Sequence, residues 1–529
     1  MLKSLFELDK KHDVSLVLSI LFSVLIALLI FGLSLSLYSV YVGWDQTTCF
    51  LVDSNATYAP DQFHVCRNNF IASDLDVYQG KVGPVTFFAI NHNPLLLLND
   101  FKWLLISSIL FLVVVVYAIF RKVICAVYLN TSTIVAITAF VLWMYFKGAV
   151  IDVDVMAFSG DYASTGANPY ELARIQGQLG LLPTFPYLPP CLILFSTLSY
   201  IRQFIELIGI PVKPYSVLSV FIGFSYIWLC FCLSKLLSKT PYDFGDRGNF
   251  FFFFLNPFGL YYVSVLTQLD IVAVSLFVFS MILLVESKGY WLLVLIASLM
   301  LFKLQHLPVI LVSLFAISVF NIKLILEKQT LKFWFFSICS VLILFSLYHV
   351  WPSLFDSLSL NPQAKRIDWS VWWSYFDNLL IFRPVGFVLI SFLLIVLSVQ
   401  DFIKPTKIDT SLVCIFAVGI FTSLYQASFA HTFGMSAFIF PASCFVAVFY
   451  TKLNLMKTIF WYVFPITLLC TWGVGILGQG NMLTALYLYP AFSVPVKLGN
   501  WLFTIEYVSH LCYGFLLAYL LKKWSYISK

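Results

Sequence analysis

Continuous runs of apolar residues, separated by short polar segments, extend over almost the whole chain. Several runs reach the roughly 20 residues that an α-helix needs to cross a bilayer. They do not alternate apolar and polar residues at every second position, as the strands of a membrane β-barrel do. The pattern therefore predicts an all-α polytopic membrane protein with about 12 to 15 membrane segments. The runs are residues 14–42, 103–120, 123–146, 190–210, 215–235, 249–266, 269–285, 289–303, 307–322, 332–350, 379–400, 411–429, 434–451, 458–476 and 500–521.

The composition excludes several other classes of protein. Of the 529 residues, 61% are hydrophobic and 11% are charged, whereas a soluble domain carries roughly 25% charged residues. A soluble enzyme, a disordered protein and a nucleic-acid-binding protein are therefore excluded. The net charge of +6 does not indicate a polyanion ligand, because the basic residues stand singly or in pairs between apolar runs.

Lysine and arginine in the short loops predict the orientation of the chain. Lysines precede the first run, occur in the later short loops and stand at the C-terminus. All of them lie on the cytoplasmic side when both termini are cytoplasmic. The first run is then a signal anchor rather than a cleavable signal peptide, since it is too long for one. The outer face receives four longer segments, residues 43–101, 147–188, 351–378 and 477–499.

Spans counted forward from the N-terminus and backward from the C-terminus assign opposite sides of the membrane to the chain between residues 189 and 270. One segment in this range is therefore expected not to cross the membrane completely. We expect 190–210 to be re-entrant, interfacial or a half-span, since Pro189 and Pro190 open it and Arg202 interrupts it. Irregular backbone at membrane depth is tolerated only where protein or a water-filled cavity covers it. The segment is therefore a candidate wall of a site.

The first outer segment contains Cys49 and Cys66, and an oxidising compartment would permit a disulfide between them. The other cysteines lie mostly within apolar runs, and no cysteine–histidine cluster indicates a metal. Residues 55–57, Asn-Ala-Thr, match an N-glycosylation acceptor, a pattern that is common by chance.

The second outer segment holds the strongest chemical signal, with Asp152, Asp154 and Asp161 directly after an apolar run. Acidic residues at a membrane interface are costly to desolvate, so their presence indicates a function, although a solvated loop with incidental acids is the alternative. A carboxylate in a partly dry cleft is able to act as a general base on an alcohol. Asp152 and Asp154 are also a candidate divalent-cation site, but the chemistry requires no metal or other cofactor.

This arrangement resembles the GT-C superfamily of membrane glycosyltransferases, which take sugars from polyprenyl-phosphate or dolichyl-phosphate carriers. The run from Asp152 to Asp161 is similar to the Asp-x-Asp signature of the catalytic subunit of GPI mannosyltransferase I. Asn168, Tyr170 and the Tyr187-Leu-Pro-Pro stretch stand where that family has its Pro-Tyr and Tyr-x-Pro elements. The resemblance implies a GT-C-like fold with interface helices on the outer face, and substrate-binding roles for Asp161, Asn168, Tyr170 and Tyr187.

Further stretches resemble bacterial GT-C proteins in the same order. Asn256-Pro257 followed by Thr267-Gln268-Leu269-Asp270 is similar to their Asn-Pro…Gly-Gln-x-Asp stretch, and residues 303–306 are similar to a Lys-Gln stretch. These stretches add Gln268, Asp270, Gln305 and His306 as substrate-binding candidates. His431, in the sequence Phe-Ala-His at 429–431, is a further candidate. Structural pairing of Asp270 with Lys303 or Arg247 is an equally weighted alternative.

The third outer segment contains Lys365 and Arg366 on the side where positive charge is unusual. A phosphate-bearing donor needs such cations, and arginine engages phosphate through two hydrogen bonds. Arg174 and Lys303 are the other candidates for this role. Trp369 is a candidate to stack on a sugar, with a place in an interfacial aromatic belt as the alternative.

We therefore expect an inverting glycosyltransferase that moves a sugar from a polyprenyl-phosphate donor to a hydroxyl of an envelope glycan, lipid or protein. Asp152 or Asp154 would activate the hydroxyl, and the basic residues would neutralise the departing phosphate. The expected modules are an N-terminal hairpin (1–122), a GT-C module with the catalytic segment 147–188 (123–350) and a C-terminal module (351–529). The expected location is a bacterial plasma membrane with the site outside, or else the endoplasmic reticulum.

Two other classes stay open at this point. A glycan polymerase or ligase of the O-antigen type would place its key arginines in a late loop and would not need the early acidic pair. A lipid-linked sugar flippase or transporter tends to show repeated halves, and no repeat is visible in this sequence.

Overall fold

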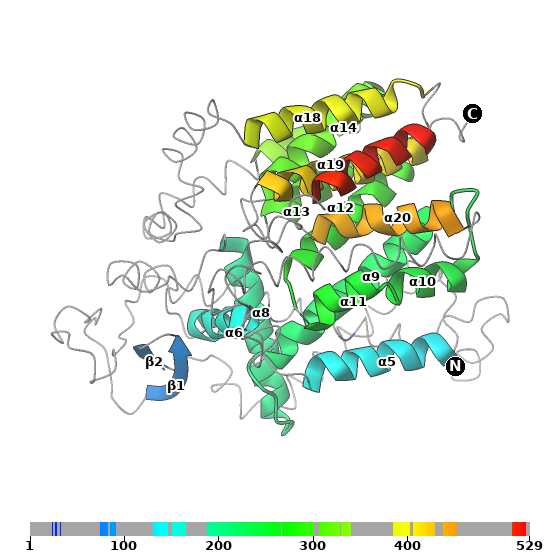
Figure 1. Ribbon diagram of the computed structural model, residues 1–529. Coiled ribbons are helices and arrows are strands. Elements are labelled where there is room, and N and C mark those ends of the chain that lie inside the picture. The colour runs from blue at the N-terminus through cyan, green and yellow to red at the C-terminus, as the bar shows by residue number, and fades with distance from the viewer. Residues whose placement is uncertain are drawn as a thin grey trace, which may run out of the picture. The chain divides into compact units, whose positions relative to one another are not determined.

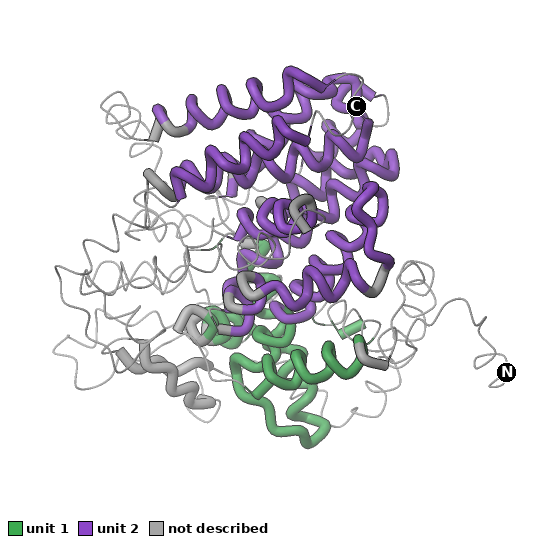
Figure 2. Tube along the Cα trace, turned by 45° about the vertical axis from the view of Figure 1, so that its right-hand side comes forward, with its two compact units in different colours: residues 1–221, 347–368 green, residues 222–346, 369–529 purple. Residues whose placement is uncertain are grey.

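The computed structural model of the chain describes residues 24, 27, 28, 32, 75–82, 85–90, 131–146, 151–164, 187, 189–265, 267–300, 306–327, 330–339, 384–402, 406–428, 437–451 and 510–524. These residues belong to two compact units, shown in Figure 2. Unit 1 comprises residues 1–221 and 347–368, and unit 2 comprises residues 222–346 and 369–529. The boundary at 221/222 falls inside one helix, and the three modules expected from the sequence stay a prediction.

The described residues are mostly helical (Figure 1). Unit 1 holds β1 (Leu75–Val82), β2 (Val85–Ile90), α5 (Thr131–Phe146), α6 (Ile151–Ser164), α8 (Pro189–Leu207) and the start of α9 (Ser216–Leu237). Unit 2 holds the rest of α9, α10 (Asp246–Phe254), α11 (Pro257–Leu260), the π-helix η4 (Tyr261–Val265), α12 (Asp270–Val285), α13 (Trp291–Met300), α14 (Leu307–Leu326), helix 330–339, α18 (Pro384–Val399), α19 (Lys407–Ser428), α20 (Ile439–Thr451) and helix 510–524.

A two-stranded antiparallel hairpin, β1–β2, lies within the first outer segment of the sequence analysis. Its pairing runs from Leu75 opposite Ile90 to Val82 opposite Val85, with an irregularity after Asp76. Valine, tyrosine and phenylalanine favour strands, and the Gly-Pro between the strands is a turn signal. The hairpin is an addition to the all-helical architecture that the apolar runs predict.

Unit 1 is built on close contact between α6 and α8. Gly160 on α6 faces the backbone of Phe195 on α8, where a Cβ atom at position 160 would lie only 2.7 Å from the carbonyl carbon. Small residues at a helix interface allow such close backbone approach. The tyrosine hydroxyl of Tyr145, at the end of α5, donates a hydrogen bond to the carbonyl oxygen of Pro211 at 2.9 Å.

Unit 2 is a bundle of adjacent helices, in which α12 packs on α13 and α19 packs on α14, α18 and α20 (Figure 1). Its core is almost entirely apolar, and the hydroxyls it buries bond mostly to the carbonyl of the preceding turn, as Thr422 does to Val418 at 2.7 Å. Such bonds satisfy hydroxyl groups where water is excluded.

Three of the described helices are long and apolar enough to cross a membrane, namely Ser216–Leu237, Pro308–Leu326 and Lys407–Tyr425. The shorter helix α18 shows the surface pattern of a helix in lipid. Leu389 and Leu393, one turn apart, are 61% and 56% exposed, whereas the small polar Ser391 and Ser398 are buried on another face. A helix of a soluble protein shows the opposite distribution. The described helices therefore fit a lipid bilayer environment.

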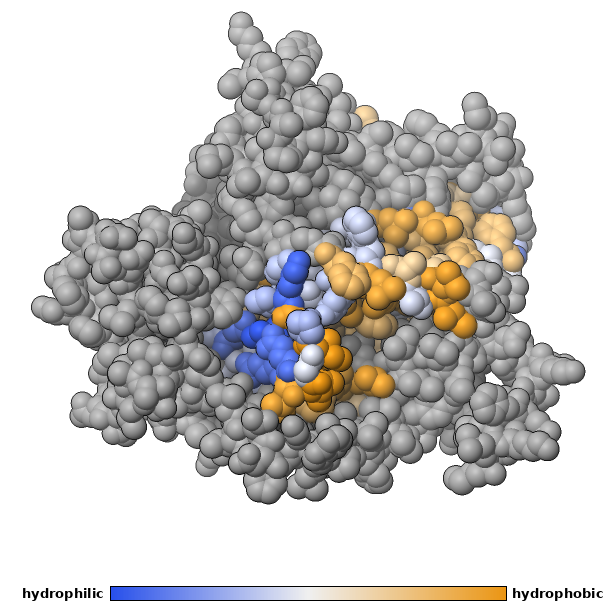
Figure 3. All heavy atoms as spheres, turned by 90° about the horizontal axis from the view of Figure 1, so that it is seen from below, coloured by the Kyte–Doolittle hydropathy of each residue, from blue (hydrophilic) through white to orange (hydrophobic). Residues whose placement is uncertain are grey.

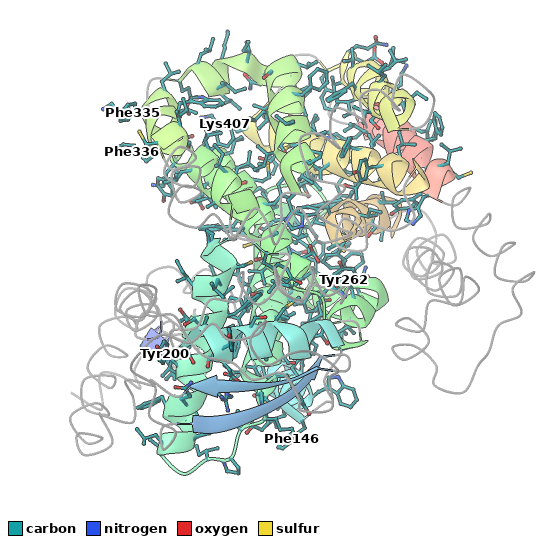
Figure 4. The ribbon with its side chains drawn as sticks, turned by 90° about the vertical axis from the view of Figure 1, so that its left-hand side faces the viewer. Phe146, Tyr200, Tyr262, Phe335, Phe336 and Lys407 are labelled. Atoms are coloured by element: carbon teal, nitrogen blue, oxygen red, sulfur yellow. The ribbon has the colours of Figure 1, made fainter. Side chains whose placement is uncertain are left out.

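Large aromatic side chains also lie on the surface of unit 2. Phe335 and Phe336 project outward from helix 330–339 (Figure 4) and are 67% and 56% exposed. In the space-filling view of Figure 3, which shows another face, described apolar side chains also lie at the surface, beside a patch of hydrophilic ones. Water penalises such exposure at roughly 25 cal/mol per Å² of apolar area, whereas lipid chains do not.

One of the predicted runs is divided in the structure, and another is continuous. Residues 190–210 were expected to be re-entrant, interfacial or a half-span. They lie largely within α8, a continuous 19-residue helix, and its place in the membrane stays a prediction. The run 249–266 divides into α10, the four-residue α11 and the π-helix η4. Pro257 explains the first division, because proline lacks the N–H that a continuing helix requires.

One end of unit 2 collects charged side chains from helix termini and short loops. Lys407 Nζ lies 2.9 Å from Ser287 Oγ and 3.2 Å from Glu327 Oε1, and Lys235 forms an ion pair with Glu286. Lys522 and Asp401 lie 3.8 Å apart, and Asp401 belongs to the short loop before α19. We call this set (Lys235, Glu286, Ser287, Glu327, Asp401, Lys407, Lys522) the charged end. Its loops are among those that the sequence analysis assigns to one side of the membrane.

Candidate functional site

The acidic signature of the second outer segment lies on a helix. The sequence analysis expected a loop there, but residues 151–164 form the continuous helix α6. The helix comprises 14 described residues, and the residues on either side of it lie outside the described ranges. Positions 154 and 161 are seven residues apart and therefore lie on the same face, two turns from each other.

Asp161 is buried between α6 and α8, at 7% exposure. Its Oδ1 atom accepts hydrogen bonds from Arg202 Nη2 at 3.0 Å and from the hydroxyl of Ser199. Arg202 also donates through Nη1 to Glu206 Oε1 at 2.8 Å, one turn further along α8. The substrate-binding candidate Asp161 is thus committed to an ion pair that holds two helices together.

A network of smaller polar groups extends this cluster. Gln203 Nε2 donates to Ser164 Oγ at 3.0 Å, and Tyr200 donates to the carbonyl oxygen of Ser164 at 2.8 Å. Figure 4 shows Tyr200 on this part of unit 1. A cavity of about 10 Å³ adjoins Asp161 and Ser199, close to the smallest space that holds one water molecule.

Ser199, Arg202 and Gln203 belong to the segment 190–210, a candidate wall of a site, but none of them was predicted as a site residue. The available signal was the polar periodicity of α8, because residues 199, 202, 203 and 206 lie at the i, i+3, i+4 and i+7 positions of one helix face. Tyr187, predicted to bind substrate, is buried, and its ring packs edge-on against Phe195 at 5.5 Å between centroids.

Asp270 and His306 form a second buried polar pair, in unit 2. Their side chains are 1% and 2% exposed, and His306 Nε2 lies 2.8 Å from Asp270 Oδ1. Asp270 stands in the first turn of α12, and His306 is the N-cap residue of α14. The alternative of pairing between Asp270 and Lys303 or Arg247 stays a prediction, because the side chains of Lys303 and Arg247 lie outside the described residues.

Three helix N-termini meet at this pair. Besides those of α12 and α14, α20 begins at Ile439, and the preceding Phe438 packs edge-on against the His306 ring at 5.2 Å. Helix N-termini carry partial positive charge and favour a carboxylate such as that of Asp270. Since α12 and α14 end at Glu286 and Glu327, the pair lies at the opposite end of these helices from the charged end.

Unusual backbone precedes Asp270. Thr267 has φ of +48°, in the left-handed region that β-branched residues rarely adopt, and it follows the π-helix η4. Its side chain is 1% exposed, and its Oγ1 atom has no hydrogen-bond partner among the described residues. Positive-φ residues and π-helical turns both cluster at functional sites.

His306 presents a similar unmet group. Its Nε2 atom contacts Asp270, whereas its buried Nδ1 atom has no hydrogen-bond partner within the described part of the chain. Gln268, between Thr267 and Asp270, is buried at 6% exposure. The segments around residues 267–270 and 306 therefore contribute to one site in unit 2. The resemblance related these segments only by their order in the sequence.

The remaining predicted site residues fall outside the described part of the chain. For Asp152 and Asp154 only the helical backbone is described. The others are Asn168, Tyr170, Arg174, Lys303, Gln305, Lys365, Arg366, Trp369 and His431, and the same holds for the cysteine pair at 49 and 66. Within the described ranges, no group of three or more histidine, cysteine, aspartate or glutamate side chains has an arrangement suited to a metal ion.

Comparison with protein-family models, curated proteins and solved structures gave no match for this chain. The functional argument therefore rests on the residues themselves. Unit 1 offers an acid-bearing helix fixed to its neighbour by an ion pair, and unit 2 offers a buried carboxylate–imidazole pair. Placing polar and charged side chains in an apolar surrounding costs free energy, so their presence makes both features candidates for a functional role.

Proposed function

We propose that this membrane protein is a glycosyltransferase that uses a sugar linked to polyprenyl phosphate. The observation that supports this most directly is the order and packing α5–α6–α8. The helix α6 carries Asp152 and Asp154 and follows the apolar helix α5 in sequence, and it packs on α8, which begins at the Pro-Pro element. This is the order of parts that the resemblance to GT-C enzymes implies.

In the proposed reaction, Asp152 or Asp154 accepts the proton of an acceptor hydroxyl. The oxygen then attacks the anomeric carbon of the donor sugar, and the bond from that carbon to the phosphate oxygen breaks. A single displacement of this kind inverts the anomeric configuration. The phosphate leaves as an anion, which the basic side chains Lys303, Lys365, Arg366 and Arg174 would stabilise. No metal or organic cofactor is needed for these steps.

The charged end of unit 2 supports an orientation of this unit with its lysine-rich loops in the cytoplasm. Loops rich in lysine are retained in the cytoplasm, and the end of α12 and α14 that holds Asp270 and His306 then faces outward. We propose a bacterial plasma membrane as the location.

The test uses purified protein in lipid nanodiscs with radiolabelled polyprenyl-phosphate glucose or mannose and short glycan or lipid acceptors. Wild-type protein should form a labelled product. The variants Asp152→Asn and Asp154→Asn should lower the rate at least a hundredfold, as expected for loss of a general base. Asp401→Asn, at the charged end, is the matched control and should retain the rate.

The same assay separates the other classes. If both acid variants transfer sugar at the wild-type rate, the acidic signature has no role in catalysis. If no product forms but labelled donor crosses proteoliposome membranes in wild type and acid variants alike, the protein is a transporter of sugar lipids. Polymerisation of an oligosaccharide without use of a monosaccharide donor would indicate the polymerase class.

A further inference from the structure

Three exposed lysines beside the charged end form no ion pair within the described part of the chain, namely Lys288, Lys323 and Lys332. The acids of the charged end are already engaged, because Glu286, Glu327 and Asp401 each pair with another lysine. Asp409 accepts hydrogen bonds from Thr406 at the start of α19. The described residues of this surface therefore carry an excess of positive charge.

Contacts within the charged end bring the first two lysines to one surface. Lys407 Nζ lies 2.9 Å from Ser287 Oγ and 3.2 Å from Glu327 Oε1, which joins the loop between α12 and α13 to the end of α14. Lys288 is the next residue of that loop. Lys323 stands in the last turn of α14, four residues before Glu327.

The helix 330–339 adds the third lysine to the same surface. The backbone N–H of Leu331 donates to the carbonyl oxygen of Glu327 at 3.0 Å, so the helix begins at the end of α14. The ring of Phe333 packs edge-on against Tyr290, a residue of the loop between α12 and α13, with 6.0 Å between centroids. Lys332 lies between these two contacts in the sequence.

Apolar side chains continue this surface along the helix 330–339. Phe335 and Phe336 follow Lys332 by three and four residues, so they lie on its side of the helix, roughly 5 Å further along the axis. Both rings are exposed, and Figure 4 shows them in the same part of unit 2 as Lys407. Positive charge beside exposed aromatic rings is typical of the boundary between lipid headgroups and acyl chains.

This combination of groups selects the class of ligand. Clusters of lysine at the end of membrane helices attract anionic lipid headgroups. A free phosphate or an acidic peptide would use the lysines but would leave the phenylalanine rings in water, which costs free energy. An anionic phospholipid carries a phosphate and an acyl chain on one molecule and suits both parts of the surface.

We propose that Lys288, Lys323 and Lys332 bind the headgroup of an anionic phospholipid, and that Phe335 and Phe336 contact its acyl chain. The ammonium groups donate hydrogen bonds to the phosphate oxygens. Since α14 begins directly after the buried histidine of the candidate site and ends at these lysines, the lipid binds at the opposite end of that helix. The inference does not depend on the proposed function.

The test uses delipidated full-length protein in detergent, with bound lipid quantified by native mass spectrometry. Phosphatidylglycerol is the anionic probe. Phosphatidylcholine with the same acyl chains is the comparison, since its headgroup contains a phosphate but has no net charge. Wild-type protein should bind phosphatidylglycerol about tenfold more tightly, because each lysine near an anionic lipid contributes roughly fivefold. Inorganic phosphate should displace no more lipid than sodium chloride of equal ionic strength.

Variants test the two parts of the site separately. Lys288→Gln and Lys332→Gln should each lower the affinity for phosphatidylglycerol about fivefold and leave that for phosphatidylcholine unchanged. Lys213→Gln, at an exposed lysine of unit 1, is the matched control and should bind as wild type. Phe335→Ala should lower both affinities by a similar factor, because the acyl chains of the two lipids are identical. The unfolding midpoints of these exposed variants should match that of wild type.

Several outcomes would overturn the inference. Equal affinity of the wild-type protein for the two lipids would exclude a site selective for negative charge. The same loss in Lys213→Gln as in the other lysine variants would mean that the total charge attracts lipid without a defined site. Specific displacement by inorganic phosphate would make this a site for free phosphate. Unchanged binding by Phe335→Ala would exclude the contact with the acyl chain. The result of the sugar-transfer assay bears only on the proposed function.

Discussion

Arg202 and Asp161 lie 41 residues apart in the sequence, and their side chains meet at 3.0 Å in the contact between α8 and α6. The two side chains are only 14% and 10% exposed. Through this ion pair the acid-bearing helix α6 is held against a long helix of the same unit. The pair therefore determines how firmly the acidic signature is positioned.

We expect Arg202→Met to destabilise the protein by about 3 kcal/mol, because removal of one partner leaves the other as an uncompensated buried charge. The free energy of unfolding is measured by titration with sodium dodecyl sulfate in mixed micelles. Glu206→Gln is the control, since Glu206 is 38% exposed and exposed pairs contribute less than about 1 kcal/mol. Equal effects of the two substitutions would contradict the role of the buried pair.

Gly160→Ala should separate α6 from α8. The added methyl group would collide with the backbone carbonyl of Phe195, which cannot rotate away. Overpacking of this kind costs roughly 1–3 kcal/mol, so the unfolding midpoint should fall. Gly386→Ala on α18 is the matched control, since a Cβ there meets no atom within 4 Å, and alanine is the better helix former. A midpoint for Gly160→Ala at or above that of wild type would show that this close contact is absent.

Thr267→Gly should stabilise the fold. Glycine adopts positive φ without steric cost, whereas threonine at +48° is strained by roughly 1–3 kcal/mol. Part of this gain is offset by the greater entropy of glycine in the unfolded chain, so we expect a net gain of about 1 kcal/mol. The measurement is the unfolding midpoint.

The control for this experiment is Thr422→Gly, a buried threonine in the middle of α19 with ordinary helical surroundings. It should destabilise by about 1 kcal/mol or more. Destabilisation of similar size by Thr267→Gly would mean that residue 267 is not strained.

The charged end should be accessible only from the cytoplasm. In a background in which all 11 native cysteines are replaced by serine, the variant Lys288→Cys should react with a membrane-impermeant maleimide only after spheroplasts are permeabilised. Lys288 follows Ser287 of the charged end and is exposed. Reaction in intact spheroplasts would reverse the proposed orientation and place the Asp270–His306 pair on the inner side.

Much of the helical structure could be predicted from local sequence. The helices α9, α12, α14 and α19 lie close to the predicted runs 215–235, 269–285, 307–322 and 411–429. A continuous apolar run is enough to specify a helix in lipid, because backbone hydrogen bonds must be satisfied within the segment itself. The break at Asn256-Pro257 was also visible as a proline inside an apolar run.

Packing decided what the local sequence left open. The polarity of residues 147–188 indicated a loop, yet residues 151–164 are a helix, because their buried face is covered by α8 and their acid at 161 is neutralised by Arg202. The contact between Asp270 and His306 was likewise decided by the tertiary structure. His306 is 36 residues away, and no periodicity relates two residues at the starts of different helices. Apolar runs act through the short-range requirement for backbone hydrogen bonds, whereas charged partners are selected by which helix ends meet.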